Sequence, residues 1–92
     1  MTYRQQVGPV RKAIRLAGID RWGFHLQAVE SNTATRIAGV VVTVAEGRRD
    51  SMTQQQRIVE LQMVQQALRA AGFWCIVCVG SDVRAYAVAQ QR

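Results

Sequence analysis

The sequence predicts an α+β domain in which two helices cover one face of a four-stranded antiparallel sheet. Three observations indicate this fold. An amphipathic helical pattern occurs twice, each pattern ends at a glycine, and a pair of short apolar segments follows each glycine. The expected order of elements is therefore α-β-β-α-β-β, and two helices on one side of the sheet are the simplest packing for that order.

The second helical pattern is the clearer of the two. Ser51 and Gln54 have the spacing of a capping box, and Gly72 suits the left-handed residue that ends a helix. Between them, apolar residues recur at intervals of three and four, which places them on one face of the helix. These residues are Ile58, Leu61, Val64, Leu68 and Ala71.

Two strands are expected after this helix. Phe73 to Val79 is an uninterrupted apolar run, and Val83 to Ala89 returns with small residues and Tyr86. Residues 80–82 have the composition of a tight turn. The two segments are therefore predicted to form a hairpin.

The first helix is expected to start at Pro9, because proline fits the first turn, where its missing N–H is no loss. It is predicted to run to Ala17 and to stop at Gly18. The residues expected to face inward share one side of this helix. They are Val10, Ala13, Ile14 and Ala17.

Two more strands are predicted between the helices. Trp22 to Val29 alternates between two sides, and Ile37 to Ala45 is apolar on both sides. Residues 30–33 have turn composition, and residues 46–50 are predicted to form a charged loop before the second helix.

Residues 10–18 align with residues 64–72, and five of the nine positions are identical. A tryptophan follows each terminal glycine at close range, at Trp22 and Trp74. Two amphipathic helices can also match by chance. An internal αββ duplication and a chance similarity therefore both stay open.

Two helices can cover only one face of the sheet, although the second and third predicted strands are apolar on both faces. A large uncovered apolar face is uncommon on a monomer. This face, or an exposed strand edge, is therefore predicted to be buried against a partner or in a homodimer. A polar replacement such as Val42→Lys is expected to disturb association before folding.

Ninety-two residues with 49% apolar composition predict a single domain over 1–92, with residues 1–8 and 90–92 loosely ordered. No apolar run approaches the length that spans a membrane, and residues 1–6 lack the apolar core of a secretory signal. Two cysteines without such a signal are typical of reduced thiols. A cytoplasmic location in a bacterial host cell, without a membrane partner, is expected.

The sequence offers little material for catalysis or metal binding. His25 is the only histidine, and no acid is near it in the sequence. Cys75 and Cys78 have the spacing of a redox or zinc motif. In a strand, however, residues three apart point to opposite faces and cannot share a metal or close a disulfide. A non-enzymatic protein without metal or cofactor is predicted.

The charge is the more informative property. Twelve basic residues against six acidic ones give a net charge of +6, and eleven of the twelve are arginine, whose planar guanidinium suits phosphate. The candidate partner- or phosphate-binding residues are Arg4, Arg11, Lys12, Arg15, Arg21, Arg36, Arg48, Arg49 and Arg84. The candidates for stacking on bases are Tyr3, Trp22 and Tyr86. Dispersed solubilising charge is the alternative explanation.

The segment Leu68-Arg69-Ala70-Ala71-Gly72-Phe73 is followed by a strand, by Gly80-Ser81 and by another strand. It resembles the helix-Gly-strand-turn-strand unit of the HicA-type RNA-cleaving toxins, whose fold is similar to a double-stranded-RNA-binding domain. That family carries a catalytic histidine directly after its Gly-Ser, where this sequence has Asp82. The resemblance covers 68–88 and implies a fold, whereas RNase activity is disfavoured.

A short, single-domain chain without a catalytic set is similar in kind to the anti-CRISPR proteins of bacteriophages. Those proteins bind bacterial defence complexes and block them without chemistry. The resemblance implies an inhibitor that docks on a ribonucleoprotein complex of protein and guide RNA through Arg-rich and protein contacts. The alternative is a small basic regulator that binds DNA or RNA, as a monomer or a dimer.

Overall fold

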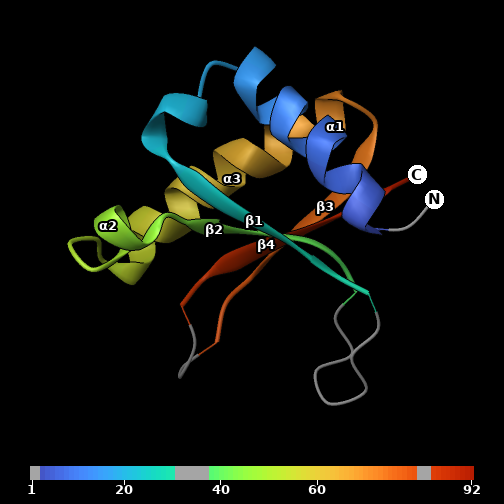
Figure 1. The fold of residues 1–92 in the computed structure, drawn as a ribbon. Helices are drawn as coiled ribbons and strands as arrows, with labels where there is room; N and C mark the ends of the chain where they lie inside the picture. The colour runs from blue at the N-terminus through green and yellow to red at the C-terminus, as the bar shows by residue number, and fades with distance from the viewer. Residues whose placement is uncertain (1–2, 31–37, 81–83) are drawn as a thin grey trace.

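Two long helices lie on one face of a four-stranded antiparallel sheet in the computed structural model of the protein (Figure 1). The structure describes residues 3–30, 38–80 and 84–92. Its helices are α1 (Tyr3–Leu16), the short η1 (Asp20–Trp22), α2 (Glu46–Arg49) and α3 (Gln54–Ala70). Its strands are β1 (Phe24–Val29), β2 (Gly39–Val44), β3 (Phe73–Cys78) and β4 (Tyr86–Gln91). The predicted fold class and the order of the main elements are confirmed.

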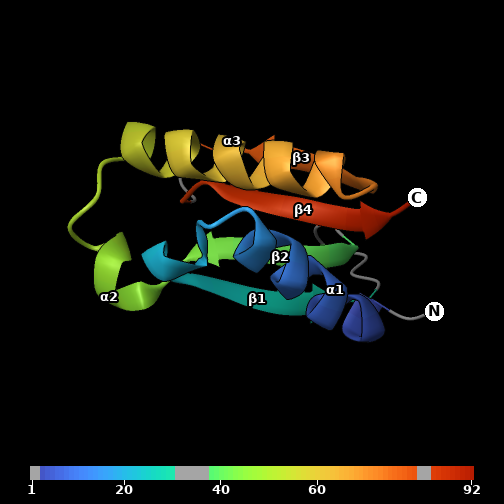
Figure 2. The same ribbon diagram turned by 90° about the horizontal axis from the view of Figure 1, so that it is seen from above.

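The strands follow the order β1-β2-β4-β3, so that two hairpins meet at the centre of the sheet. Each hairpin pairs six residues with six, from Phe24 opposite Val44 in the first and from Phe73 opposite Gln91 in the second. α1 packs mainly on the first hairpin, and α3 packs on the second (Figure 2). The two halves of the chain thus share a helix–hairpin arrangement.

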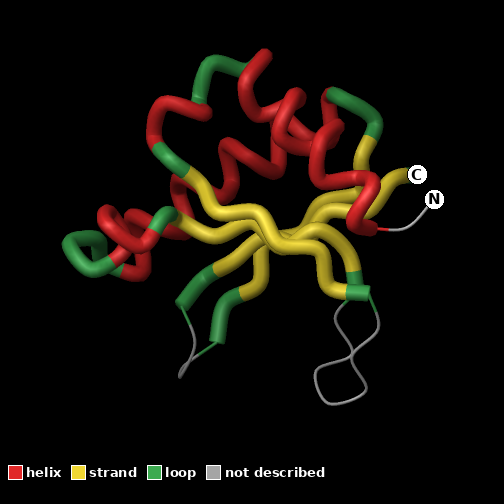
Figure 3. Tube along the Cα trace, in the orientation of Figure 1, coloured by secondary structure: helices red, strands yellow, loops and turns green. Residues whose placement is uncertain are grey.

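The core lies between the sheet and the two long helices, which Figure 3 shows together on one side of the strands. Alternation along each strand sends every second side chain into this layer. The fully buried members with the largest side chains are Val10, Val40, Val42, Val44, Leu61, Val64, Leu68 and Cys75. In the part of the chain that the structure describes, no helix is long and apolar enough to cross a membrane.

The other face of the sheet carries no helix among the described residues, so the prediction of one-sided coverage is confirmed (Figure 3). On this open face, Trp74 is 61% exposed and Ile76 is 56% exposed. Val42 was expected to act on association, and that expectation was wrong. It pairs with Leu26 and Ala87 on the helix-facing side and is 0% exposed, because the hairpin register sets which residues face the helices.

α1 begins six residues before the predicted start, so that Pro9 lies inside the helix. The buried Gln6 explains the extra turns, because its Oε1 accepts a hydrogen bond of 2.8 Å from the backbone N–H of Gln91. This contact ties the start of α1 to the end of β4. Residues 3–8 and 90–91 are therefore ordered in helix and strand, contrary to the prediction, and Ala17 is exposed instead of facing inward.

The capping box of α3 is formed two residues later than predicted. Thr53 Oγ1 accepts from Gln56 N at 3.1 Å, and Gln56 Oε1 accepts from Thr53 N at 2.8 Å. Ser51 instead donates to the carbonyl of Arg48 at 3.0 Å, closing the single turn of α2 where a loop was predicted. Gly72, with φ of +92°, ends the helix region as predicted, but Ala71 is exposed and lies outside the buried stripe.

All four predicted strands differ from the structure at their ends, and β2 ends at Val44 instead of Ala45. Trp22 belongs to η1, and β1 starts at Phe24, because Gly23 with φ of +81° interrupts the extended backbone. β3 ends at Cys78, and β4 starts at Tyr86. The predicted turns at 30–33 and 80–82 fall largely outside the described residues.

Gly39→Ala should destabilise the protein by about 1–3 kcal/mol. Gly39 has φ of +142°, and a Cβ there would lie 2.6 Å from the carbonyl oxygen of Ala89. Gly8→Ala is the matched control, because nothing lies within 4 Å of its Cβ position inside α1. That change should stabilise by about 0.5–1 kcal/mol. Urea unfolding measures both, and equal effects would contradict the close approach of β2 to β4.

Candidate functional site

Four exposed cations lie on α1. Because α1 begins at Tyr3, Arg4 stands on the same helix as Arg11 and Arg15, at spacings of seven and four residues. Such spacings align side chains along one stripe, with Cα atoms about 10 Å and about 6 Å apart along the helix axis. Lys12 is the neighbour of Arg11 on the same helix. We refer to Arg4, Arg11, Lys12 and Arg15 together as the α1 basic stripe.

All four side chains of the α1 basic stripe are exposed, and α1 contains no acidic residue. None of the four makes an ion pair with an acid in the described part of the chain. Glu30 accepts a hydrogen bond from the backbone N–H of Arg4 at 3.2 Å. That contact satisfies one of the free N–H groups at the helix start, where a carboxylate is favourable.

Arg48 must be removed from the predicted phosphate-binding set. Its guanidinium donates to the carbonyl of Trp22 and pairs with the carboxylate of Glu60. It also lies 3.4 Å from the carbonyl of Gly23, so it links η1, α2 and α3. A guanidinium with these internal partners is not available to a ligand without breaking the contacts between three elements.

The remaining predicted cations are dispersed. Arg84 pairs with Asp50 at 3.1 Å on the surface, where such pairs contribute little stability. Arg21 lies in η1 and Arg49 lies in α2, away from α1 in the sequence and in different elements. Arg36 lies outside the described residues. Of the nine predicted residues, the structure therefore brings together the four on α1.

The predicted stacking residues do not form one surface. Trp22 is half-buried, packs against the core and has its ring centroid 6.5 Å from that of Phe24, so its predicted stacking role is not supported. Tyr3 is half-buried at the start of α1. Tyr86 lies on the open face, where burial and the neighbouring thiol of Cys78 raise the pKa of its phenol.

Trp74 is the exposed aromatic residue that the list of stacking candidates left out. It is 61% exposed on β3, and the Arg92 guanidinium lies 5.1 Å from the centre of its ring. This distance is typical of a cation–π contact. The strand alternation already placed Trp74 opposite Cys75, which was the signal that it would point away from the helices.

His25 has neighbours that the sequence did not reveal. It lies opposite Thr43 in the sheet, and both line a depression with Glu46 of α2. No hydrogen bond joins His25 to either residue within the described ranges. A general base is usually oriented by a hydrogen bond, and His25 makes none of this kind among the described residues.

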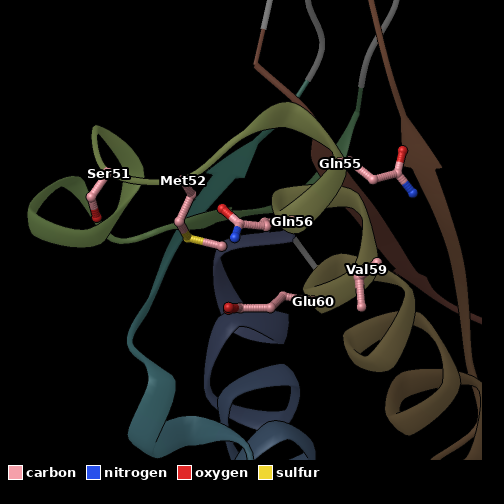
Figure 4. Close-up of a pocket in the computed structure, with 6 residues that line it drawn as sticks. All are labelled: Ser51, Met52, Gln55, Gln56, Val59 and Glu60. Carbon is pink, nitrogen blue, oxygen red and sulfur yellow. The ribbon is translucent and has the colours of Figure 1, made fainter.

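A surface depression lies where α2 leads into α3 (Figure 4). It is lined by Ser51, Met52, Gln55, Gln56, Val59 and Glu60. The charged group among these residues is Glu60, which already pairs with Arg48 and whose other oxygen, Oε1, is buried without a partner. A depression with an acidic wall of this kind does not suit a phosphate.

The two cysteines point to opposite faces of β3, as predicted. Cys75 is 1% exposed on the helix-facing side, and Cys78 is half-buried on the open face. Both thiols are free. Within the described ranges, no three residues of His, Cys, Asp or Glu are placed to hold a metal ion together.

Stability should fall at alkaline pH because of Cys75. Burial raises the pKa of its thiol from the usual 9.0 to about 11. The unfolded chain therefore loses this proton first, and about 2–3 kcal/mol of stability should disappear as the pH rises from 9 to 11. Urea unfolding across this range measures the loss. Cys75→Ala should be less stable at neutral pH but should show a smaller fall, and an unchanged fall would contradict the assignment.

Arg48→Ala should destabilise the protein by about 1–3 kcal/mol, because it leaves the carboxylate of Glu60, which is half-buried and has a buried Oε1, without its ion-pair partner. Arg84→Ala removes the same side chain from an exposed pair and should change stability by less than about 0.5 kcal/mol. Thermal and urea unfolding of the two variants compare the pairs directly. Equal losses would argue against a structural role for Arg48.

Comparison of the chain with protein-family models, with curated proteins and with solved structures finds no match in any of the three. What the chain does must therefore follow from the geometry of its own surfaces. That geometry offers a basic helix stripe on one side of the molecule and an apolar sheet face on the other.

Proposed function

We propose that this chain is a small non-enzymatic binding protein that docks on a bacterial ribonucleoprotein complex, with the α1 basic stripe against its phosphates. The observation that carries the proposal is the stripe itself: four exposed cations on one helix, without an acid on that helix. Arginine binds phosphate through two parallel N–H groups, and three of the four cations are arginines.

The size of the stripe favours a complex over bare nucleic acid. Each neutralised phosphate contributes about −0.9 to the slope of log affinity against log salt, so four contacts give a slope of roughly −3 to −4. Proteins that bind by phosphate contacts alone reach dissociation constants of about 10⁻⁴ to 10⁻⁶ M at physiological salt. Protein contacts in addition to phosphates would supply the missing affinity.

Exposed apolar side chains on the helices are suited to such protein contacts. Leu16 is 76% exposed at the end of α1, four residues after Lys12. Val59 and Met63 are 48% and 40% exposed on α3. The helix layer thus combines cations with exposed apolar groups, which is the mixed composition of protein–protein interfaces with a polar rim.

The specific role that fits these features is inhibition by occupancy. A chain of 92 residues that covers a phosphate-binding groove would exclude the nucleic acid that the complex normally holds there. No bond needs to be made or broken for this effect. The similarity in kind to anti-CRISPR proteins agrees with such a role, and a bacterial defence complex with its guide RNA is the corresponding target.

Arg11→Gln/Arg15→Gln should release the target complex from the tagged protein in a bacterial lysate at about 0.15 M salt. The matched control is Arg84→Gln/Arg92→Gln, which removes the same two charges from outside the stripe and should retain the target. Purified wild-type protein should keep a defined ribonucleoprotein complex at about 0.5 M salt, where pure phosphate contacts are weak.

Two results would contradict the proposal. Retention of the complex by both double variants would show that the stripe is not in contact with it. Capture of bulk nucleic acid that is lost at about 0.5 M salt, without a defined complex, would support a small basic regulator of DNA or RNA instead.

A further inference from the structure

The open sheet face carries a patch of exposed apolar residues that the proposed function does not use. Among its residues, Trp74 and Ile76 of β3 are 61% and 56% exposed. Val41 of β2 and Tyr86 of β4 are half-buried on the same side. A contiguous apolar patch over three strands is typical of an interaction surface.

The free edge of β3 is a poorer candidate for association than this face. Gln65 Nε2 and Arg69 Nε, both from α3, donate to the carbonyl oxygen of Cys75 at 3.0 and 3.2 Å. In an antiparallel strand, that carbonyl points away from the paired neighbour and toward the edge. An incoming strand would have to displace both side chains, and covering an edge in this way is a known protection against strand addition.

The charges of the chain are placed so that two open faces can meet. None of the 24 residues in the four strands is Asp, Glu, Lys or Arg. The α1 basic stripe lies on the helix layer, on the opposite side of the sheet (Figure 1). Two copies in contact through their open faces would therefore bring no charged strand residues together, despite a net charge of +6 each. A cation beside the patch is Arg92, whose guanidinium lies over the ring of Trp74.

The patch also contains both a projection and a hollow. Trp74 and Ile76 stand out from β3, and between them lies a depression whose other lining residues are Cys75, Val88 and Gln90. Val88 is 8% exposed although no helix covers it. A surface with a projection beside a hollow can complement a second copy of itself across a two-fold axis, as an isologous dimer requires.

We propose that the open sheet face binds a second copy of this chain, face to face, through Trp74, Ile76, Tyr86 and Val88. Four strands spaced about 4.8 Å apart and about 20 Å long give a flat area of about 400 Å². A standard interface buries about 800 Å² per partner, so the contact is small and the dimer reversible. We expect a dissociation constant between about 1 and 100 μM.

Sedimentation equilibrium of the full chain over about 1–500 μM tests this proposal. The average mass should rise with concentration from 10.3 kDa toward twice that value. Raising the salt from about 0.1 to about 0.5 M should leave the dimer unchanged or strengthen it, because the interface holds no ion pair and salt screens the repulsion between copies. Phosphate binding by the α1 basic stripe weakens over the same salt range. The failure of one proposal can therefore be distinguished from the failure of the other.

Ile76→Lys should weaken the dimer by at least about tenfold, since it places a charge in the apolar contact. Trp74→Gln should weaken it as well. Gln62→Lys is the matched control, because it adds the same charge at an exposed position of α3 outside the patch. This control should dimerise like the wild type. Thermal unfolding confirms that the variants are folded, which is expected because both patch residues are exposed in the monomer.

A wild-type protein that stays at 10.3 kDa at every concentration and at both salts would overturn the proposal. A dimer that persists unchanged in folded Ile76→Lys and Trp74→Gln would also overturn it, because association would then use another surface.

Discussion

β2 and β4 pair through residues 40–42 and 87–89, and this short contact joins two helix–hairpin units into one sheet. A two-stranded hairpin is at best marginally stable by itself, whereas four strands under two helices share one core. The contact requires a close approach of the two strands at its end, where Gly39 of β2 lies against the carbonyl of Ala89 of β4. Small residues at Ala87 and Ala89 leave room for Val40 and Val42 beneath the helices.

Joining the hairpins in this way leaves the molecule with two unlike sides. Each helix packs on its own hairpin, and both lie on the same face of the sheet (Figure 3). The exposed cations of α1 therefore belong to the helix side of the molecule. The other face keeps the strand residues that alternation directs away from the core, and these are uncharged. A molecule with one basic side and one apolar side can bind phosphates and a second protein surface without competition between the two.

Several long polar side chains stabilise the fold and are not part of a binding surface. Gln6 holds the end of β4, Gln65 and Arg69 cover the edge of β3, and Arg48 links η1 and α2 to α3. Each satisfies backbone carbonyls or N–H groups that the small sheet leaves open. An arginine-rich composition therefore divides into structural and exposed members, and the two kinds cannot be separated by counting charges.

The sequence by itself determined the fold class, the order of elements and the existence of an uncovered apolar face. These features depend on local periodicity, which places Leu61, Val64 and Leu68 on one helix side and Cys75 and Ile76 on opposite strand faces. Four members of the candidate site, on α1, were also identified from the sequence. The alignment of Arg4 with the other three was not, because Pro9 suggested a later helix start.

The tertiary structure alone decided the strand order, the face on which Val42 lies and the internal ion pair of Arg48. Each of these depends on a contact between residues far apart in the chain: β2 with β4, the register of a hairpin, and Glu60 with Arg48. Periodicity specifies which residues share a face, but it does not specify which face is covered. That choice was made by where the two helices pack.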